Sequence, residues 1–245
     1  MNMNNIITLL KKQTKNVIYN AFIISSLIMM PFFAWIMTSG GERGSEELAY
    51  ALLFYVLLNT VINAINMAAC LIAEEKEQNT LNVLMTSTIK ASELLVSNLI
   101  ITFLAVIVSN IAIYFLLSGY DFMNFSTFIF SSSLGSIVAI LMGAIIGIVC
   151  KSQMIASSVA AALGFASLFI TDILYHLNLS GFLNDVVYQL YPLPFVRLLM
   201  TSGMTYYEET AGFVVGDIIG LLINIVLFAG IFIVIYKKRG LENNR

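Results

Sequence analysis

The chain has 245 residues, of which 59% are apolar and only 11% are charged. A single soluble domain of this length could not bury so much apolar surface, so the composition argues against a soluble enzyme. The 12 Lys and Arg nearly balance the 14 Asp and Glu, and a formal charge of -2 argues against nucleic-acid partners, which require clustered positive charge.

Six long windows without Lys or Arg predict membrane-spanning helices, because a bilayer core about 30 Å thick requires roughly 20 apolar helical residues. In chain order they are residues 17–38, 48–73, 94–117, 127–150, 154–171 and 212–236. Asp217 is the only acidic residue within them, and its place near the start of the sixth window could let it reach the lipid headgroups. The fifth window is short and rich in Ala, Ser and Gly, so we expect it to pack between neighbouring helices rather than face lipid.

The basic residues predict that both termini are cytoplasmic, since Lys and Arg are retained on that side. Ten of the twelve fall in predicted inner segments, whereas nine of the fourteen acidic residues fall in outer ones. Residues 1–16 combine Ile and Leu with Lys and predict an amphipathic helix on the inner membrane surface. Residues 172–211 are too apolar for a plain outer loop; they predict helical turns that dip partly into the outer leaflet and are broken by Pro192 and Pro194. The expected fold is therefore one all-α integral membrane domain.

The segment of residues 74–93 joins the second and third predicted spans on the inner side. It begins with an acidic cluster, Glu74, Glu75 and Glu77 around Lys76, whose charge suits a helix N-terminus. Thr80 follows, and then an apolar stripe that would line one face of a short helix and suit a partner's groove or the membrane surface: Leu81, Leu84, Met85 and Ile89.

The pattern Glu-Lys-Glu-x-x-Thr-Leu in this segment, followed by a leucine-rich turn, Thr/Ser-x-x-Ile and Glu-Leu-Leu, resembles the permease subunits of ABC-2-type exporters. The six predicted spans, the inside termini, the basic N-terminal helix and the long last outer loop are also similar to that family. The resemblance implies a transport subunit of a bacterial cell membrane that pairs with a second permease chain, identical or paralogous. It also implies a separate ABC ATPase subunit that docks on residues 74–93.

ATP and Mg would belong to that partner, because the chain lacks the phosphate-loop pattern G-x-x-x-x-G-K-[ST]. We therefore expect no enzyme activity and no cofactor bound by this chain. We expect no metal site either, because the single histidine, His176, has no second His or Cys on its predicted side of the membrane.

The second predicted span carries Asn59, Asn63 and Asn66 on one helical face. Buried amides are costly in lipid unless they are paired, so this stripe predicts either a lining of the transport path or hydrogen bonds between helices. Three further asparagines are expected to form isolated packing hydrogen bonds: Asn98, Asn110 and Asn224. Five glycines predict faces for close helix packing, within one chain or between two: Gly143, Gly147, Gly212, Gly216 and Gly220.

These patterns together predict a permease that forms the path for hydrophobic or amphipathic cargo and is driven by a separate ATPase. Similarity to bacterial exporters of phenol-soluble modulins favours peptide toxins or antimicrobial peptides as cargo, and lipids, polysaccharides or drugs are the alternatives. A channel or structural membrane protein without ATP coupling is the alternative of another class. An ion-coupled carrier is disfavoured because no ionisable residue lies in the middle of a predicted span.

Overall fold

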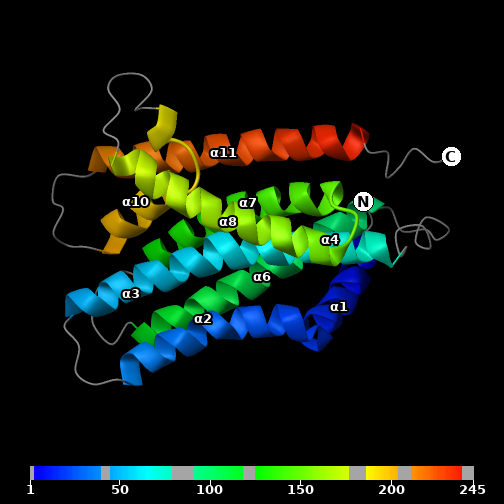
Figure 1. Cartoon of the computed structure of the whole chain (residues 1–245), viewed down its shortest axis with the longest axis horizontal. Coiled ribbons are helices and arrows are strands. Elements are labelled where there is room, and N and C mark those ends of the chain that lie inside the picture. The colour runs from blue at the N-terminus through cyan, green and yellow to red at the C-terminus, as the bar shows by residue number, and fades with distance from the viewer. Residues whose placement is uncertain are drawn as a thin grey trace.

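The computed structural model describes residues 3–39, 45–78, 91–117, 125–176, 186–203 and 211–238, and these residues form helices and turns without any strand. Figure 1 shows an elongated bundle in which most helices run along the long axis, and α1 runs at a steep angle to them across one end, from α2 toward the end of α4. The elements in chain order are α1 (Met3–Tyr19), α2 (Ala21–Ser39), α3 (Ser45–Leu58), the π-helix η1 (Asn59–Asn63), α4 (Ala64–Glu77), α6 (Ala91–Leu117), α7 (Phe125–Val149), α8 (Gln153–His176), α10 (Leu193–Gly203) and α11 (Ala211–Lys238).

Within the described ranges, four helical segments are each long and apolar enough to cross a membrane: Glu47–Glu77, Ser92–Leu117, Phe125–Val149 and Val215–Lys238. They correspond to the second, third, fourth and sixth predicted windows. Helices suit this environment because they satisfy every interior backbone hydrogen bond within the segment, where lipid offers no partner. The chain is therefore an all-helical protein with membrane-spanning character.

The first and fifth predicted windows form helices whose crossing of the membrane stays a prediction. The first corresponds to α2, which follows α1 after a bend of 65°. Only the two helices together are long and apolar enough to cross a membrane. The buried face of α1 carries Ile6, Leu9, Gln13 and Val17, which follow helical spacing and point into the bundle. The fifth window lies in α8, whose apolar part, Gln153–Phe169, is shorter than the other candidate spans.

Helix α4 lies at the centre of the bundle and packs against both α7 and α8. Its residues from Ala64 to Ala73 are buried except for the half-buried Asn66. Small residues on the facing helices allow the close approach. A β-carbon on Gly143 would lie 2.3 Å from the carbonyl oxygen of Ile65, and one on Gly147 would lie 2.8 Å from that of Ala69.

The expectation that the fifth window packs between neighbouring helices agrees with one face of α8. The small residues of α8 do pack inward, since Ala156 and Ala160 are fully buried and Gly164 lies against Ile62 of η1. The opposite face is exposed and carries large apolar side chains: Met154, Ile155, Val159, Leu163, Phe165, Phe169 and Ile173. Ser158 and Ala162 lie on the exposed side as well, so the content of small residues alone could not show which side of this helix packs against the bundle.

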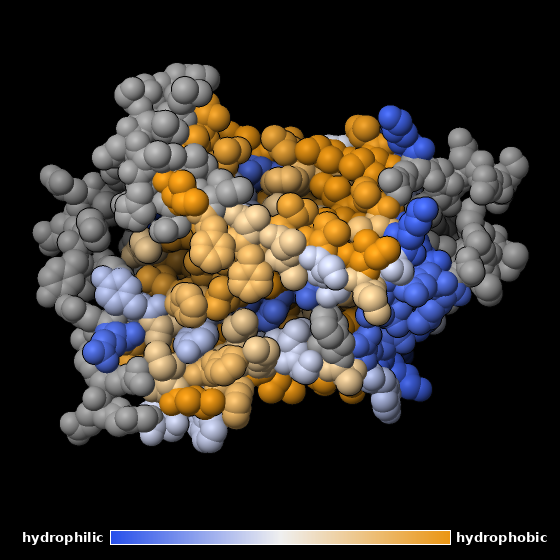
Figure 2. Space-filling view, in the orientation of Figure 1, coloured by the Kyte–Doolittle hydropathy of each residue, from blue (hydrophilic) through white to orange (hydrophobic). Residues whose placement is uncertain are grey.

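The two ends of the bundle differ in polarity. Figure 2 shows hydrophilic side chains gathered at the end where α1 lies and where α4 and α11 finish, which we name the charged end. At the opposite end, α10 packs against α7 and α11 and buries Leu193, Phe195, Leu198 and Leu199. Pro192 and Pro194 lie at the start of α10, and Pro194 occupies its first turn, where proline costs no hydrogen bond.

Candidate functional site

The acidic cluster at Glu74–Glu77 forms the last turn of α4, and the short helix that the sequence predicts after it falls outside the described residues. Negative charge is unfavourable at a helix C-terminus because the helix dipole is negative there. Contacts with other helices must therefore hold these carboxylates in place. Successive residues of an α-helix are about 100° apart, so four consecutive side chains point in four directions.

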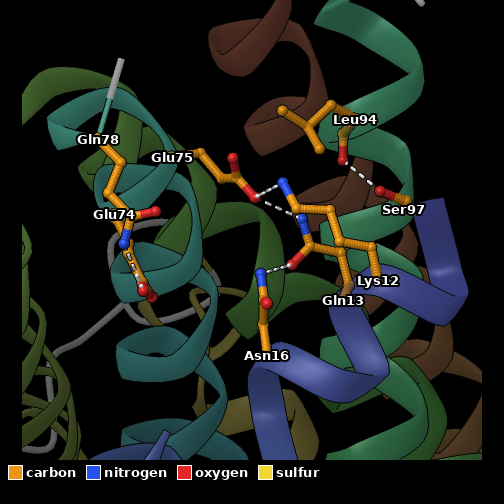
Figure 3. A network of polar contacts seen from close by, with 8 residues as sticks. All are labelled: Lys12, Gln13, Asn16, Glu74, Glu75, Gln78, Leu94 and Ser97. Carbon is orange, nitrogen blue, oxygen red and sulfur yellow. Dashed lines mark hydrogen bonds and ion pairs between the residues drawn. The ribbon is translucent and has the colours of Figure 1, made fainter. Parts of the chain in front are cut away.

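Glu75 connects α4 to α1 (Figure 3). Its side chain is only 6% exposed, and its Oε1 accepts hydrogen bonds from Nε2 of Gln13 at 2.7 Å and Nζ of Lys12 at 3.3 Å. Gln13 is itself fully buried and accepts a hydrogen bond from Asn16 at 3.1 Å. The buried carboxylate is thus paired with a cation and hydrogen-bonded to an amide, which is the condition under which a buried charge is tolerated.

Lys76 connects α4 to the end of α7. Its Nζ donates to the carbonyl oxygens of Ile148 and Cys150, each at 2.6 Å. The last carbonyl groups of a helix have no partner within that helix and carry the negative end of its dipole. A lysine ammonium is therefore a favourable ligand for the C-terminal end of α7.

Glu77 and Glu74 contact two further places in the chain. Oε2 of Glu77 accepts a hydrogen bond at 2.8 Å from the backbone N–H of Gln153, the first residue of α8, where the helix dipole favours an anion. Glu74 accepts hydrogen bonds from Asn20, which separates α1 from α2, at 3.4 Å and from Gln78 at 3.0 Å. The four side chains thus connect the end of α4 to α1, the α1–α2 junction, α7 and α8.

A second contact fixes α1 to the start of α6. Nδ2 of Asn5 donates to Oε2 of Glu93 at 3.0 Å, and Glu93 is buried in the first turn of α6. The two ends of the predicted segment 74–93 therefore both contact α1. The other residues predicted to engage a partner fall outside the described ranges: Thr80, Leu81, Leu84, Met85 and Ile89.

A buried polar network occupies the middle of the bundle around η1. Asn59 donates to Oδ1 of Asn110 at 2.7 Å, and Asn110 donates to Thr60 at 2.9 Å and to Ser132 at 2.6 Å. Asn63 donates to Asn59 at 3.0 Å and to the carbonyl oxygen of Ser26 at 2.8 Å. The network therefore connects α2, η1, α6 and α7.

The three asparagines of the predicted stripe do not all belong to this network. Asn59 and Asn63 belong to the network, whereas the Oδ1 of Asn66 accepts a contact at 3.3 Å from Sγ of Cys70 on its own helix. A π-helix inserts an extra residue per turn, which changes the direction of the side chains that follow it. A role of the three residues in lining a transport path stays a prediction.

The sequence predicted an isolated packing hydrogen bond for Asn110, but this side chain forms hydrogen bonds with three partners. The predicted topology already indicated that these polar residues could meet. Asn59, Asn110 and Ser132 lie 11, 7 and 5 residues from the outer ends of their predicted windows, at comparable depth. Asn98 differs again: it is 1% exposed, and neither atom of its amide has a hydrogen-bond partner in the described structure.

The glycines predicted for packing have different surroundings. Gly143 and Gly147 lie against α4 of the same chain, as described above. On α11, a β-carbon at Gly220 would lie 2.0 Å from Oε1 of Gln189, whereas one at Gly216 would meet nothing within 4 Å. Gly212 is the second residue of α11, and its surroundings lie outside the part of the chain that the structure describes.

A buried ion pair joins α10 to α11 at the end opposite the charged end. Nη2 of Arg197 lies 2.5 Å from Oδ1 of Asp217, and the carboxylate is 1% exposed. Asp217 is therefore buried beside a cation that α10 supplies. That it could reach the lipid headgroups stays a prediction. Arg197 also donates to the carbonyl oxygen of Tyr188 at 2.7 Å and lies over its ring.

Asn224 strengthens the same attachment. Its Nδ2 donates to the carbonyl oxygen of Gln189 at 2.6 Å, and its Oδ1 accepts from the backbone N–H of Tyr191 at 3.3 Å. Burial raises the pKa of the Tyr191 phenol above its usual range. Within the described residues, no group of three or more His, Cys, Asp or Glu side chains could hold a metal ion.

Comparison with known proteins found no family model and no curated protein that matches the chain.

Proposed function

We propose that the chain is the transmembrane subunit of an ABC-2-type exporter in a bacterial cell membrane. The observation that carries this proposal is the set of contacts made by Glu74, Glu75, Lys76 and Glu77. A partner that moves the segment after Glu77 would pull on four other parts of the chain at once. Such an arrangement suits the transmission of force from a separate ATPase better than an inert loop would.

The proposal places the charged end in the cytoplasm. Lys11, Lys12, Lys15, Lys237 and Lys238 all lie at this end, and cytoplasmic segments carry the excess of Lys and Arg. In this orientation residues 74–93 face the cytoplasm, where an ABC ATPase would dock. ATP and Mg bind to that ATPase, and this chain catalyses no reaction itself.

The proposal also includes a second permease chain, identical or paralogous. The exposed apolar face of α8 offers a helix surface for it, since the small residues of that helix are already used against α4. The path for cargo would then form between the two chains or along the network around Asn59 and Asn63. Hydrophobic or amphipathic molecules, peptides first among them, suit the apolar interior of the bundle.

The test is co-expression of this chain with any ABC ATPase that is encoded next to its gene, followed by purification and reconstitution into lipid vesicles. We expect the two proteins to purify together, and we expect amphipathic peptides to stimulate ATP hydrolysis. The variant Glu77→Gln should reduce the peptide-stimulated rate, because it removes the negative charge that Glu77 places at the start of α8. Lys11→Gln is the matched control: it removes an exposed charge at the same end of the bundle.

The outcomes separate the alternatives. Stimulation by lipids or drugs but not by peptides would keep the exporter and change its cargo. Failure of any ABC ATPase to bind, together with ion flux through vesicles that contain this chain alone, would support a channel instead. Full stimulation in Glu77→Gln would show that the charge of Glu77 at the start of α8 is not needed to transmit force.

A further inference from the structure

An apolar groove of about 740 Å³ opens between α3, α10 and the end of α2, at the end of the bundle opposite the charged end. Pockets that hold drug-sized ligands have volumes of about 300 to about 1,000 Å³, so this groove is large enough for one. Most of its wall consists of aliphatic and aromatic side chains, contributed by α3 and by Val196, Leu199 and Met200 of α10.

The described charge that lines the groove is negative. Among the described residues that line it, Glu47 is the single charged side chain, and this residue is exposed. The wall contains no described basic residue to neutralise it. Arg197 follows Val196 on α10 but is engaged with the buried carboxylate of Asp217 on α11. A ligand that reaches the groove therefore meets a negative charge.

The side chains of α3 that line the groove change from charged to apolar along the helix. Glu47, Tyr50, Phe54 and Leu57 line the groove at spacings of three, four and three residues, so they form one face of the helix. With a rise of 1.5 Å per residue, this face extends about 15 Å from the carboxylate to the aliphatic end. Tyr50 and Phe54 are more than half exposed, and their rings can contact a cation placed near Glu47.

We propose that this groove binds an amphipathic cation, with its ammonium group beside Glu47 and Tyr50 and its apolar chain along Phe54, Leu57 and α10. An anionic amphiphile would be repelled by the Glu47 carboxylate, and an uncharged one would gain no attraction from it. The site belongs to this chain alone and goes beyond the proposed function, because binding requires neither the ATPase nor transport.

The experiment measures equilibrium binding of radiolabelled dodecyltrimethylammonium to the full chain in nanodiscs of an uncharged galactolipid, with empty nanodiscs subtracted. We expect a saturable component that unlabelled dodecylammonium displaces. Dodecyl sulfate and dodecanol have the same chain length, so they are matched competitors, and we expect neither to displace the probe at equal concentration.

Variants locate the site. Glu47→Gln should weaken binding about fivefold, the upper range for an exposed ion pair, and Glu47→Asp should largely restore it. Met200→Trp should weaken binding at least tenfold by filling the groove, and the half-exposed position of Met200 allows the larger ring. Leu222→Trp on α11 is the control, since Leu222 has similar exposure and does not line the groove.

Other occupants of the groove are outcomes that would overturn the proposal. Displacement of the probe by added phosphatidylcholine would assign the groove to a zwitterionic lipid. A disulfide between two Phe54→Cys chains in the nanodisc would assign it to a second copy. Equal saturable binding by the wild type and by both the Glu47→Gln and Met200→Trp variants, or no saturable binding at all, would exclude the groove as the site. None of these results bears on whether an ATPase docks at the charged end.

Discussion

Asn110 accepts a hydrogen bond from Asn59 across 2.7 Å, and this contact joins the middle of α6 to the π-helix η1. Both side chains are fully buried. Because Asn110 also donates to Thr60 and Ser132, its loss would leave polar groups on two other elements without a partner. Such orphaned groups cost more than the hydrogen bond itself contributes.

The first prediction compares two buried asparagines of the same helix. Asn110→Leu should lower the free energy of unfolding by about 1–3 kcal/mol, because it orphans the amide of Asn59. Asn98→Leu should be neutral or stabilising, because the Asn98 amide has no partner to lose. Cys70 and Cys150 are free and buried, so a thiol-reactive fluorophore can report thermal unfolding of each variant in detergent. Equal destabilisation by both changes would contradict the network.

The second prediction concerns two glycines. Gly143→Ala should destabilise the bundle by about 1–3 kcal/mol, since the new methyl group would meet the backbone of Ile65 and force α7 away from α4. Gly216→Ala should raise stability by up to about 1 kcal/mol, because alanine favours the helix and the space around Gly216 is open. The same thiol assay measures both. A stable Gly143→Ala protein would show that the two helices are not in close contact.

The sequence was sufficient to predict the helical class and four of the membrane-length segments, because each depends on a long run of apolar residues that any arrangement of helices would share. It also singled out Glu74–Glu77. The directions in which these four side chains point could not be predicted, because they depend on where α4 ends. Their negative charge alone favoured a position at the start of a helix. Only the packed bundle shows that Lys76 stabilises the end of α7 and Glu77 the start of α8.

Contacts between residues far apart in the chain could not be predicted from the sequence either. Asn59 and Asn63 were recognisable as costly polar residues in an apolar helix, but their partners lie about 50 residues away in the chain or on the backbone of α2. Arg197 and Asp217 show the same limit. Each belongs to a different helix, and nothing in the local sequence indicates that α10 folds back onto α11.

The third prediction tests the attachment of α1. Replacing Glu75 by Leu should cost about 1–3 kcal/mol, because Gln13 would keep a buried amide without its acceptor. Lys12→Gln should cost no more than about 1 kcal/mol, since the lysine side chain is 41% exposed and water screens the pair. Lys11→Gln should have no measurable effect. Thermal unfolding of the three variants at equal salt concentration provides the comparison. If Lys12→Gln proved as damaging as Glu75→Leu, the ion pair rather than the buried amide would hold α1.

The last prediction concerns the ion pair between Arg197 and Asp217, whose two partners differ in exposure. Arg197→Met would leave the 1% exposed carboxylate of Asp217 without its cation, and breaking a buried pair in this way costs about 3–5 kcal/mol. Asp217→Leu should cost less, because Arg197 is 19% exposed and keeps its contact with the carbonyl oxygen of Tyr188. The double variant Arg197→Met/Asp217→Leu should be close to the wild type or more stable, since a well-packed apolar pair avoids the cost of removing two charges from water. A thiol-reactivity melt of all four proteins gives the coupling energy directly. Additive losses in the double variant would show that the two side chains act independently, and α10 would then be held to α11 chiefly by Asn224 and the buried leucines.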